Sequence, residues 1–155
     1  AAPAREQLLA FVDEHRAALG RCLDDVTEDE ARRGLVPSRT TLLGLVKHAT
    51  FVERVWFDEG VHGRTRAEIG IPASPDASFA LTAEDTIASA VAAHRLACSD
   101  SRAAIVGLDL DDVVTGNRRG PLPLRWVLVH VLRELAQHAG HADILREQIL
   151  AAREG

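Results

Sequence analysis

The residues best suited to chemistry lie in the stretch 125–148, RWVLVHVLRELAQHAGHADILREQ. Four of its side chains can bind a metal ion or carry a proton: His130, Glu134, His138 and His141. On a helix of 3.6 residues per turn, His138 falls within an apolar stripe, and the other three lie roughly 60° to 100° to one side. Burying a carboxylate and imidazoles costs several kcal/mol unless they are paired or coordinated. A metal ion is the simplest compensation, so the stretch predicts a metal site on the inward face of a helix.

The spacing of these residues suits a site built across two helices. Glu134 and His138 are four residues apart and therefore adjacent on a helix surface. His48, in an earlier helical segment, can approach them from across a bundle. Three protein ligands with one open position are typical of a catalytic divalent site. His141, three residues after His138, could instead supply a fourth ligand and close the site as a structural one.

Each of these residues also has an ordinary interpretation. His48 can be a hydrogen-bonded core histidine, and His141 a polar surface residue. Glu134 can be solvated, or paired with Arg133 or Arg125. Together they could form a metal-free hydrogen-bond network between helices or at a dimer interface. In that case His48→Ala would change the stability of the protein without changing its metal content.

Four helical segments must position these residues, and no segment reads convincingly as a strand. The predicted helices are residues 4–24, 38–60 with Ser38 or Thr40 as the N-cap, 82–105 beginning at a capping sequence at Thr82, and a fourth helix with Pro121 and Pro123 in its first turn. Two longer connections join them, residues 60–82 and 107–121, and the second can contain a turn or short hairpin. This pattern predicts a four-helix bundle.

The composition is that of a globular protein with one core. A chain of 155 residues, 46% hydrophobic and 26% charged, suits a single domain over residues 1–155. The net charge of −5 disfavours nucleic acid as a ligand, because phosphate binding needs a basic surface. No apolar run is long enough to span a membrane. Cys22 and Cys98 lie in no motif, and they favour two structural thiols in a reducing cytoplasm over a disulfide.

Two passages of the sequence resemble the DinB-like superfamily. They are TLLGLVKHATFVERVWF, which contains His48, and LRWVLVHVLRELAQHAGHADILREQI, residues 124–149. LLAFVDEHRAAL and LVPSRTTLLGLVKH extend the resemblance over almost the whole chain, most closely to an actinobacterial branch of unknown function. The resemblance implies an all-α four-helix bundle of DinB type with long crossover connections, often assembled as a homodimer.

The resemblance also implies a set of metal ligands. The superfamily typically binds a divalent metal through one histidine on the second helix and two residues four apart on the fourth. By position these are His48, Glu134 and His138. Glu134 departs from the commonest pattern, which has histidine there, and is similar to the related mycothiol-dependent maleylpyruvate isomerases. A carboxylate shifts the preference toward harder ions while still suiting zinc, so we expect zinc or nickel.

Characterised relatives use mycothiol or bacillithiol as a thiol cofactor. The resemblance therefore implies a metal-dependent thiol S-transferase or isomerase that uses mycothiol and acts on a small electrophilic molecule. His141 and His130 are then candidates for proton transfer, and His130 also for orienting a ligand. The alternative is a non-catalytic DinB-like bundle, in which the metal stabilises the fold or the pocket only binds a small molecule.

Basic and aromatic residues add candidates for binding an anionic substrate or cofactor. The arginines are Arg39, Arg54, Arg118, Arg119 and Arg125, each of which can equally be solvated or salt-bridged. Trp56 and Trp126 are expected in the core or at its rim, where they can also line a pocket.

Overall fold

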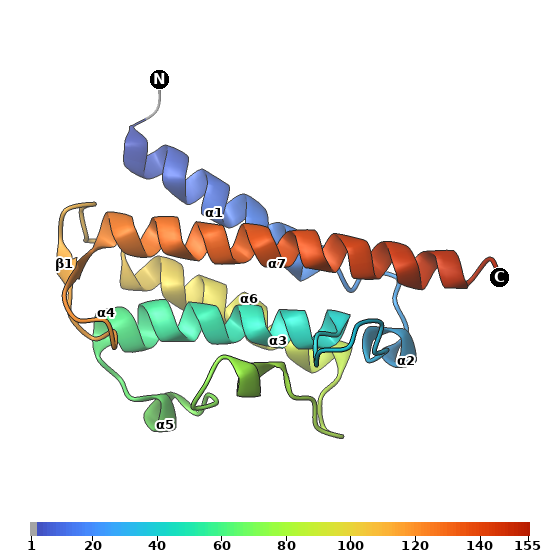
Figure 1. The fold of residues 1–155 in the computed structure, drawn as a ribbon. Coiled ribbons are helices and arrows are strands. Elements are labelled where there is room, and N and C mark those ends of the chain that lie inside the picture. The colour runs from blue at the N-terminus through green and yellow to red at the C-terminus, as the bar shows by residue number, and fades with distance from the viewer. Residues whose placement is uncertain (1–2) are drawn as a thin grey trace.

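The computed structural model describes residues 3–155, and within this range four long helices form the all-α bundle that the sequence predicts (Figure 1). These helices are α1 (Ala4–Arg21), α3 (Leu42–Glu53), α6 (Ile87–Ala104) and α7 (Leu124–Ala152). Helix α7, with 29 residues, packs along α1 and α3, and α6 packs on α3. The two helices that carry the predicted metal ligands, α3 and α7, are therefore direct neighbours.

The N-terminus of α3 is capped by Thr41. Its hydroxyl accepts a hydrogen bond from the backbone N–H of Gly44 at 3.0 Å. The prediction of Ser38 or Thr40 as the cap is wrong, because Thr41 makes the capping hydrogen bond, and the hydroxyl of Ser38 donates instead to that of Thr40 at 3.1 Å. The helix therefore starts one residue after Thr41, which still leaves His48 in its second turn.

Helix α3 continues without a break through a π-helical segment, η1 (Arg54–Glu59), into the short α4 (Gly60–His62). Gly63 ends this helix at φ 71°, a left-handed conformation that favours glycine. The wider turn of the π-helix lies beside the connection between α6 and α7. Such π-helical turns are frequent at functional sites. This turn brings the backbone carbonyls of Glu59 and Gly60 next to that connection, as described below.

The connection after α4 contains the short helices α5 (Arg66–Ile69) and η2 (Asp76–Phe79). In Figure 1 it runs along the outer side of α3, and η2 contacts α3 directly. Both α5 and the short α2 (Glu28–Ala31) begin with a capping box, which satisfies backbone N–H groups that so short a helix cannot pair internally. The connection is thus ordered by local hydrogen bonds and by its packing on α3.

Helix α6 begins later than the sequence predicts. Its N-cap is Thr86, which forms a capping box with Ser89, and the prediction of a start at Thr82 is wrong. The backbone N–H of Thr82 donates to the carboxylate of Asp85 at 2.6 Å, and Lys47 donates to the same carboxylate at 2.8 Å. Thr82 therefore caps a separate turn tied to α3, rather than the helix itself.

The connection from α6 to α7 contains the short hairpin that the sequence allowed. Strands β1 (Val113–Val114) and β2 (Leu122–Pro123) pair antiparallel, with Val113 opposite Pro123. Pro123 is the N-cap of α7 and is extended, so the two prolines precede the helix and the prediction that they lie in its first turn is wrong. Proline is tolerated here because its missing N–H is not required by the helix.

The core lies between the apolar faces of the four helices. The predicted stripe of α7 is buried throughout: Val131, Leu135, Ala142, Leu145 and Ile149. Both cysteines are buried and free. None of the helices in the described range is both long and apolar enough to cross a membrane.

Candidate metal centre

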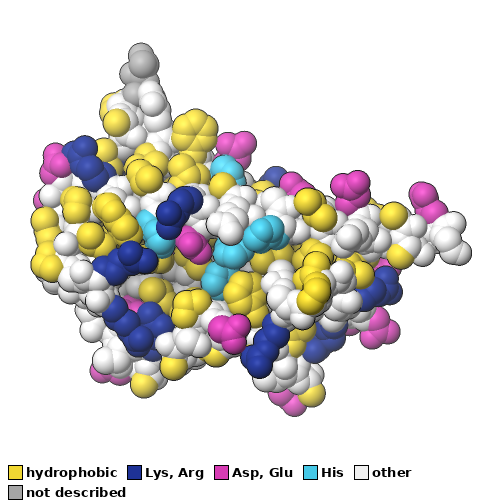
Figure 2. Space-filling model, in the orientation of Figure 1, with side chains coloured by type: hydrophobic (Ala, Val, Ile, Leu, Met, Phe, Trp, Pro, Cys, Tyr) yellow, Lys and Arg dark blue, Asp and Glu magenta, His cyan; other side chains and the backbone are white. Residues whose placement is uncertain are grey.

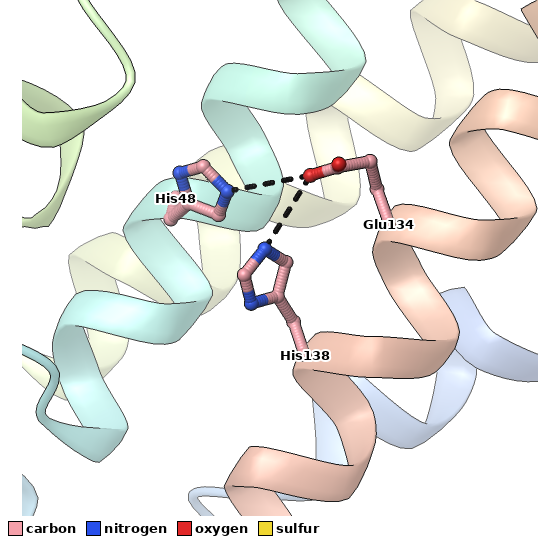
Figure 3. A group of neighbouring side chains, drawn as sticks. All are labelled: His48, Glu134 and His138. Carbon is pink, nitrogen blue, oxygen red and sulfur yellow. Dashed lines mark ion pairs between the residues drawn. The ribbon is translucent and has the colours of Figure 1, made fainter.

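Three predicted ligands converge between α3 and α7. His48 projects from α3, and Glu134 and His138 project from successive turns of α7 toward it (Figure 3). One oxygen of Glu134, Oε2, lies 4.0 Å from His48 Nε2 and 3.5 Å from His138 Nε2. The three ligand atoms lie within 4.8 Å of one another, and among the described residues this is the group whose spacing suits a metal ion. We call these three residues the His48 cluster.

Ser78, in η2, fixes the orientation of the His48 ring. Its hydroxyl lies 2.7 Å from His48 Nδ1 and also 2.5 Å from the carbonyl oxygen of Pro75. A carbonyl can only accept, so the single hydroxyl hydrogen of Ser78 goes to Pro75 and the hydroxyl accepts from Nδ1–H. His48 Nε2 is then left with a lone pair that faces the cluster, as a metal ligand requires.

Phe79, the residue after Ser78, packs on the same ring. The rings of His48 and Phe79 are stacked, with centroids 4.2 Å apart and planes at 12°. The exposed fraction of His48 is only 4%. One face of the imidazole is thus covered, and η2 supplies both its hydrogen-bond partner and its packing.

The cluster combines an ionised carboxylate with imidazole rings. His138 and His48 hold the pKa of Glu134 far below its usual range, so the carboxylate is ionised. Burial lowers the pKa of His48, which favours the neutral imidazole. Neither distance to Glu134 is short enough for a good hydrogen bond. The cluster thus presents an ionised carboxylate beside two imidazole nitrogens, a set of donors that a divalent cation can bind.

The donor set fits a divalent ion. Ligand atoms of a tetrahedral zinc site lie roughly 3.3 Å apart, as follows from bonds of about 2.0 Å. The separations of 3.5 and 4.0 Å in the His48 cluster are slightly larger than this edge. Two imidazole nitrogens and one carboxylate oxygen are also the donors that zinc accepts. A small inward movement of the side chains would therefore produce three-ligand coordination.

His138 is less firmly held than His48. Its Nδ1 is buried and has no hydrogen-bond partner within residues 3–155. Its ring meets that of His48 edge-on, with centroids 4.5 Å apart. The two histidines thus differ, because only His48 has a partner that fixes its tautomer.

The cluster opens into a cavity of about 330 Å³. Its wall includes His48 and Glu134, the aromatic ring of Trp56, and several arginines. A volume of this size suits a small-molecule site. Figure 2 shows histidine side chains on the same face as a group of lysine or arginine side chains. The open side of the cluster is thus accessible to a small molecule.

His130 lines this cavity one turn before Glu134, outside the metal-binding group. Its ring is stacked on Trp126, with centroids 5.0 Å apart, and its Nδ1 lies 3.1 Å from a guanidinium nitrogen of Arg133. Arginine only donates, so Nδ1 accepts and a neutral His130 carries its proton on Nε2. Burial, followed by the nearby arginines, keeps its pKa lowered despite Glu134. His130 is therefore a neutral hydrogen-bond donor.

His141 lies apart from the group that could hold a metal. It is exposed and lines a different pocket, together with Val36 and Ile144. Its ring centroid is 5.6 Å from that of His138. The cluster that the structure brings together thus has three members, and His141 is adjacent to it rather than part of it.

The structure separates the five arginines that the sequence suggested as anion anchors. Three of them form ion pairs outside the cavity: Arg39 with Asp76, Arg54 with Asp100, and Arg125 with Asp111. Arg118 and Arg119 do line it, and Trp56 also contributes to its wall. The hypothesis of an anion anchor therefore remains for two residues of one loop.

Sequence reasoning missed several residues of the site. Ser78 and Asn117 lie in irregular connections, where no periodicity marks a side chain as inward-facing. Arg66 lines the cavity from α5, and Arg133 was considered only as a partner of Glu134. The Ser-Pro-rich stretch around Ser78 indicates a turn, but it carries no sign that the turn packs on His48.

Comparison with known proteins identifies similarity at two levels. A family model described as Mycothiol-S-transferase matches residues 7–151. A search of curated proteins gives no match. Among solved structures, a conserved protein from Enterococcus faecalis is similar with a TM-score of 0.74 over 97% of this chain and 99% of that one, at 15% identity. At that identity the likeness supports the bundle fold alone.

Proposed function

The chain belongs to the mycothiol-S-transferase family, a DinB-like family, and from this membership we propose that it transfers a thiol of the mycothiol type to a small electrophilic molecule. We further propose that a divalent metal, zinc or nickel, is held by His48, Glu134 and His138. The observation that carries the proposal is the convergence of these three ligand atoms beside an accessible cavity. The family description names S-transfer, which favours transfer over isomerisation.

The protein's own thiols support an external thiol donor. Burial raises the pKa of both Cys22 and Cys98 to about 12, so neither is a thiolate near neutral pH. Neither residue lines the cavity beside the His48 cluster. The reacting sulfur must therefore come from a diffusible molecule that enters this cavity.

In the proposed reaction, a thiolate sulfur attacks an electrophilic carbon, the C–S bond forms, and the leaving group departs with its electron pair. A bound divalent ion would lower the pKa of a coordinated thiol and so provide thiolate at neutral pH. His48 is held in the required tautomer by Ser78, and the thiol proton is released to solvent. His130, with its proton on Nε2, can donate to the leaving group or to an anionic substrate.

Two features favour this function over a structural metal site. A structural zinc site is normally closed by four protein ligands. The His48 cluster has three, and the carboxylate of Glu134 also lines the open cavity. A fourth position directed at that cavity suits an exchangeable ligand rather than a protein side chain.

The test compares metal content and thiol transfer in matched variants. Glu134→Gln and His48→Ala are expected to lose about one equivalent of zinc or nickel, by elemental analysis after dialysis, and to lose transfer. Glu147→Gln, at an exposed glutamate of the same helix, is the control and should retain both. Transfer is measured as the loss of free mycothiol with bromoacetate or bromoacetamide.

Two results would contradict the proposal. If the wild-type protein bound no divalent ion, the cluster would be a hydrogen-bond network only. If it bound metal but did not accelerate the reaction of mycothiol with either alkylating agent, the metal would be structural, and the stability lost on chelation would measure its contribution.

A further inference from the structure

The cavity beside the His48 cluster carries unneutralised positive charge on one wall. Four arginines line it, against one carboxylate, that of Glu134: the arginines are Arg66, Arg118, Arg119 and Arg133. Arg66 and Arg118 are both bound by Glu59, at 2.9 and 3.3 Å. Arg119 and Arg133 have no carboxylate within ion-pair distance among the described residues, and they contact aromatic rings instead.

These two arginines contact the stacked rings of Trp126 and His130, of which His130 lines the cavity. The guanidinium of Arg119 lies over the Trp126 ring, 5.4 Å from its centroid. The Trp126 ring is stacked on that of His130, and Arg133 donates to His130 Nδ1. Arg119 therefore contacts the tryptophan of this stacked pair, and Arg133 contacts its histidine. Arg119, which lies over a ring, keeps its N–H groups free for an anion, and Arg133 donates one N–H to His130 and keeps the others.

The loop that carries Arg119 is held against the junction of η1 and α4. The backbone N–H of Gly116 donates to the carbonyl of Gly60 at 3.0 Å. A Cβ at Gly116 would lie 2.0 Å from the carbonyl oxygen of Glu59, so this approach requires glycine. The position of the loop relative to the cavity is thus set by close backbone packing and not only by surface contacts.

Asn117, the next residue, provides an independent sign of a missing ligand. It is 7% exposed and lines the cavity, and its Oδ1 accepts from the backbone N–H of Arg119 at 2.9 Å. Its amide nitrogen is buried without a hydrogen-bond partner in residues 3–155. A buried donor without an acceptor is costly, and native proteins rarely retain one without a reason.

The polar groups of this wall are donors. They are the guanidinium groups of Arg119 and Arg133, the Nδ2 of Asn117 and the Nε2–H of His130. A carboxylate is acceptor-only and matches such a set, whereas a hydroxyl-rich thiol would present donors as well.

We propose that the electrophile carries a carboxylate, which binds the wall formed by Asn117, Arg119 and Arg133 beside the His48 cluster. This inference rests on the proposed thiol transfer and adds the substrate class. A small halogenated or unsaturated acid fits it. With bromoacetate, the thiolate displaces bromide, so that the C–S bond forms, the C–Br bond breaks, and bromide leaves with the electron pair.

The first test is the selectivity for charge between two alkylating agents of similar size. In Arg119→Gln and Arg133→Gln, kcat/KM for bromoacetate should fall roughly ten- to a hundredfold, and that for bromoacetamide should not change. The control is Arg125→Gln, which removes a guanidinium that lies outside the cavity and pairs with Asp111. An equal loss in the control, or equal losses with both agents, would overturn the proposal.

The second test measures binding without turnover. Succinate, added to the metal-loaded protein, should change the fluorescence of Trp56 and Trp126, the two tryptophans of the chain, whereas succinamide should not. The response should be lost in Arg119→Gln and Arg133→Gln and kept in Arg125→Gln, with circular dichroism showing that each variant is folded. No response to succinate in the wild type would overturn the carboxylate site.

The two proposals can fail separately. Binding of succinate that depends on Arg119, in a protein without transferase activity, supports the carboxylate site and contradicts the proposed function. Transfer that is as fast with bromoacetamide as with bromoacetate, and that Arg119→Gln and Arg133→Gln do not alter, supports the proposed function and overturns the carboxylate site.

Discussion

Helix α3 carries two buried polar clusters, and the difference between them separates a structural role from a chemical one. The first is the His48 cluster, which faces α7. The second, the Glu53 cluster, faces α1 and α6 and contains Glu53, Arg16, His94 and Cys98. His48 and Glu53 are five residues apart on α3, which places them roughly 140° apart around its axis.

The two carboxylates have different partners. Glu53 is fully buried and binds Arg16 through two hydrogen bonds, of 2.7 and 2.9 Å. Burial acts to lower the pKa of Arg16, but the hydrogen bonds and charge of Glu53 outweigh it and the pKa is raised. Glu134 faces two imidazoles at longer distances and no permanent cation. A carboxylate with a fixed cation is neutralised within the fold, and one without it can bind an ion.

The imidazole and the thiol of the Glu53 cluster, His94 and Cys98, are also unreactive because of their burial. His94 Nε2 lies 3.5 Å from Cys98 Sγ, a pairing found in nucleophilic sites. Burial lowers the pKa of His94, whereas burial and the charge of Glu53 raise that of Cys98 to about 12. Both groups are therefore uncharged near neutral pH, and proximity alone does not make this pair a nucleophile.

The largest expected effect is on stability and comes from breaking the closed cluster. Arg16→Met leaves the Glu53 carboxylate buried without its cation, and we expect a loss of about 3–5 kcal/mol in the free energy of unfolding. Urea denaturation followed by circular dichroism measures it. Glu134→Gln, measured in the presence of a chelator, should cost clearly less, because Glu134 is partly exposed and has no permanent partner.

The double variant Arg16→Met/Glu53→Leu is the control for this prediction. Replacing both members of a buried ion pair by apolar side chains is often neutral or stabilising, so most of the loss should be recovered. If the double variant were as unstable as Arg16→Met, the loss would come from packing on Phe57, whose ring lies 5.4 Å from the guanidinium of Arg16, and not from the unpaired charge.

The next effect is on metal affinity and tests how the open cluster is held. Ser78→Ala removes the group that orients His48, and we expect metal to bind roughly 10- to 100-fold more weakly, as is usual when such a partner is lost. Competition with a chromogenic chelator measures the affinity. Ser99→Ala, at an exposed serine of α6, should leave it unchanged. Equal affinities in the two variants would show that Phe79 packing alone positions the ring.

The contribution of Ser78 marks the limit of what the sequence could predict. The four helices follow from apolar periodicity, and the proximity of Glu134 and His138 from their i,i+4 spacing, because both are local properties of a helix. The prediction of His48, Glu134 and His138 as one set of metal ligands rests on the family resemblance. Ser78 reaches His48 across thirty residues, from a segment without periodicity. Its role depends on how η2 packs, which no local pattern encodes.

The start of α6 and the arginines illustrate the same limit. Thr82 and Thr86 both begin sequences that can cap a helix. Lys47 binds the carboxylate of Asp85 and holds the Thr82 turn on α3, so the helix begins after Thr86. Arg118 and Arg119 are neighbours in sequence, yet Glu59 neutralises the first, while the second lies over Trp126. Which residues are free for function is thus decided by partners distant in the chain.

A smaller effect is expected on the pH dependence of stability, again in the closed cluster. The pKa of His94 is lowered when folded, chiefly by burial, whereas in the unfolded chain it is about 6.5. Neutral His94 therefore contributes fully to the free energy of unfolding above pH ~6.5. This contribution is lost as the pH falls from the unfolded pKa toward the folded pKa, by at most about 1.4 kcal/mol per pH unit. His94→Gln should reduce this slope.

Urea unfolding of both proteins between pH ~7.5 and ~5.5 measures the slope, with a chelator present to remove metal linkage at the His48 cluster. The same slope in wild type and His94→Gln would mean that His94 has the same pKa in the folded and unfolded states and gains its proton within the fold below that pKa. The Glu53 cluster would then contain a positive imidazole, and its description as a closed, uncharged pair would be wrong.

The smallest expected effect concerns the cysteines, and here the prediction is no change at all. With a pKa of about 12, the fraction of Cys98 present as thiolate at pH ~8 is on the order of 10⁻⁴. Iodoacetamide should therefore label neither Cys22 nor Cys98 in the folded protein and should label both in guanidinium chloride. Cys98→Ala and Cys22→Ala should transfer mycothiol at the wild-type rate. Fast labelling of native Cys98, with transfer lost in Cys98→Ala, would assign the nucleophile to the Glu53 cluster and would reverse the roles that the buried charges of the two clusters indicate.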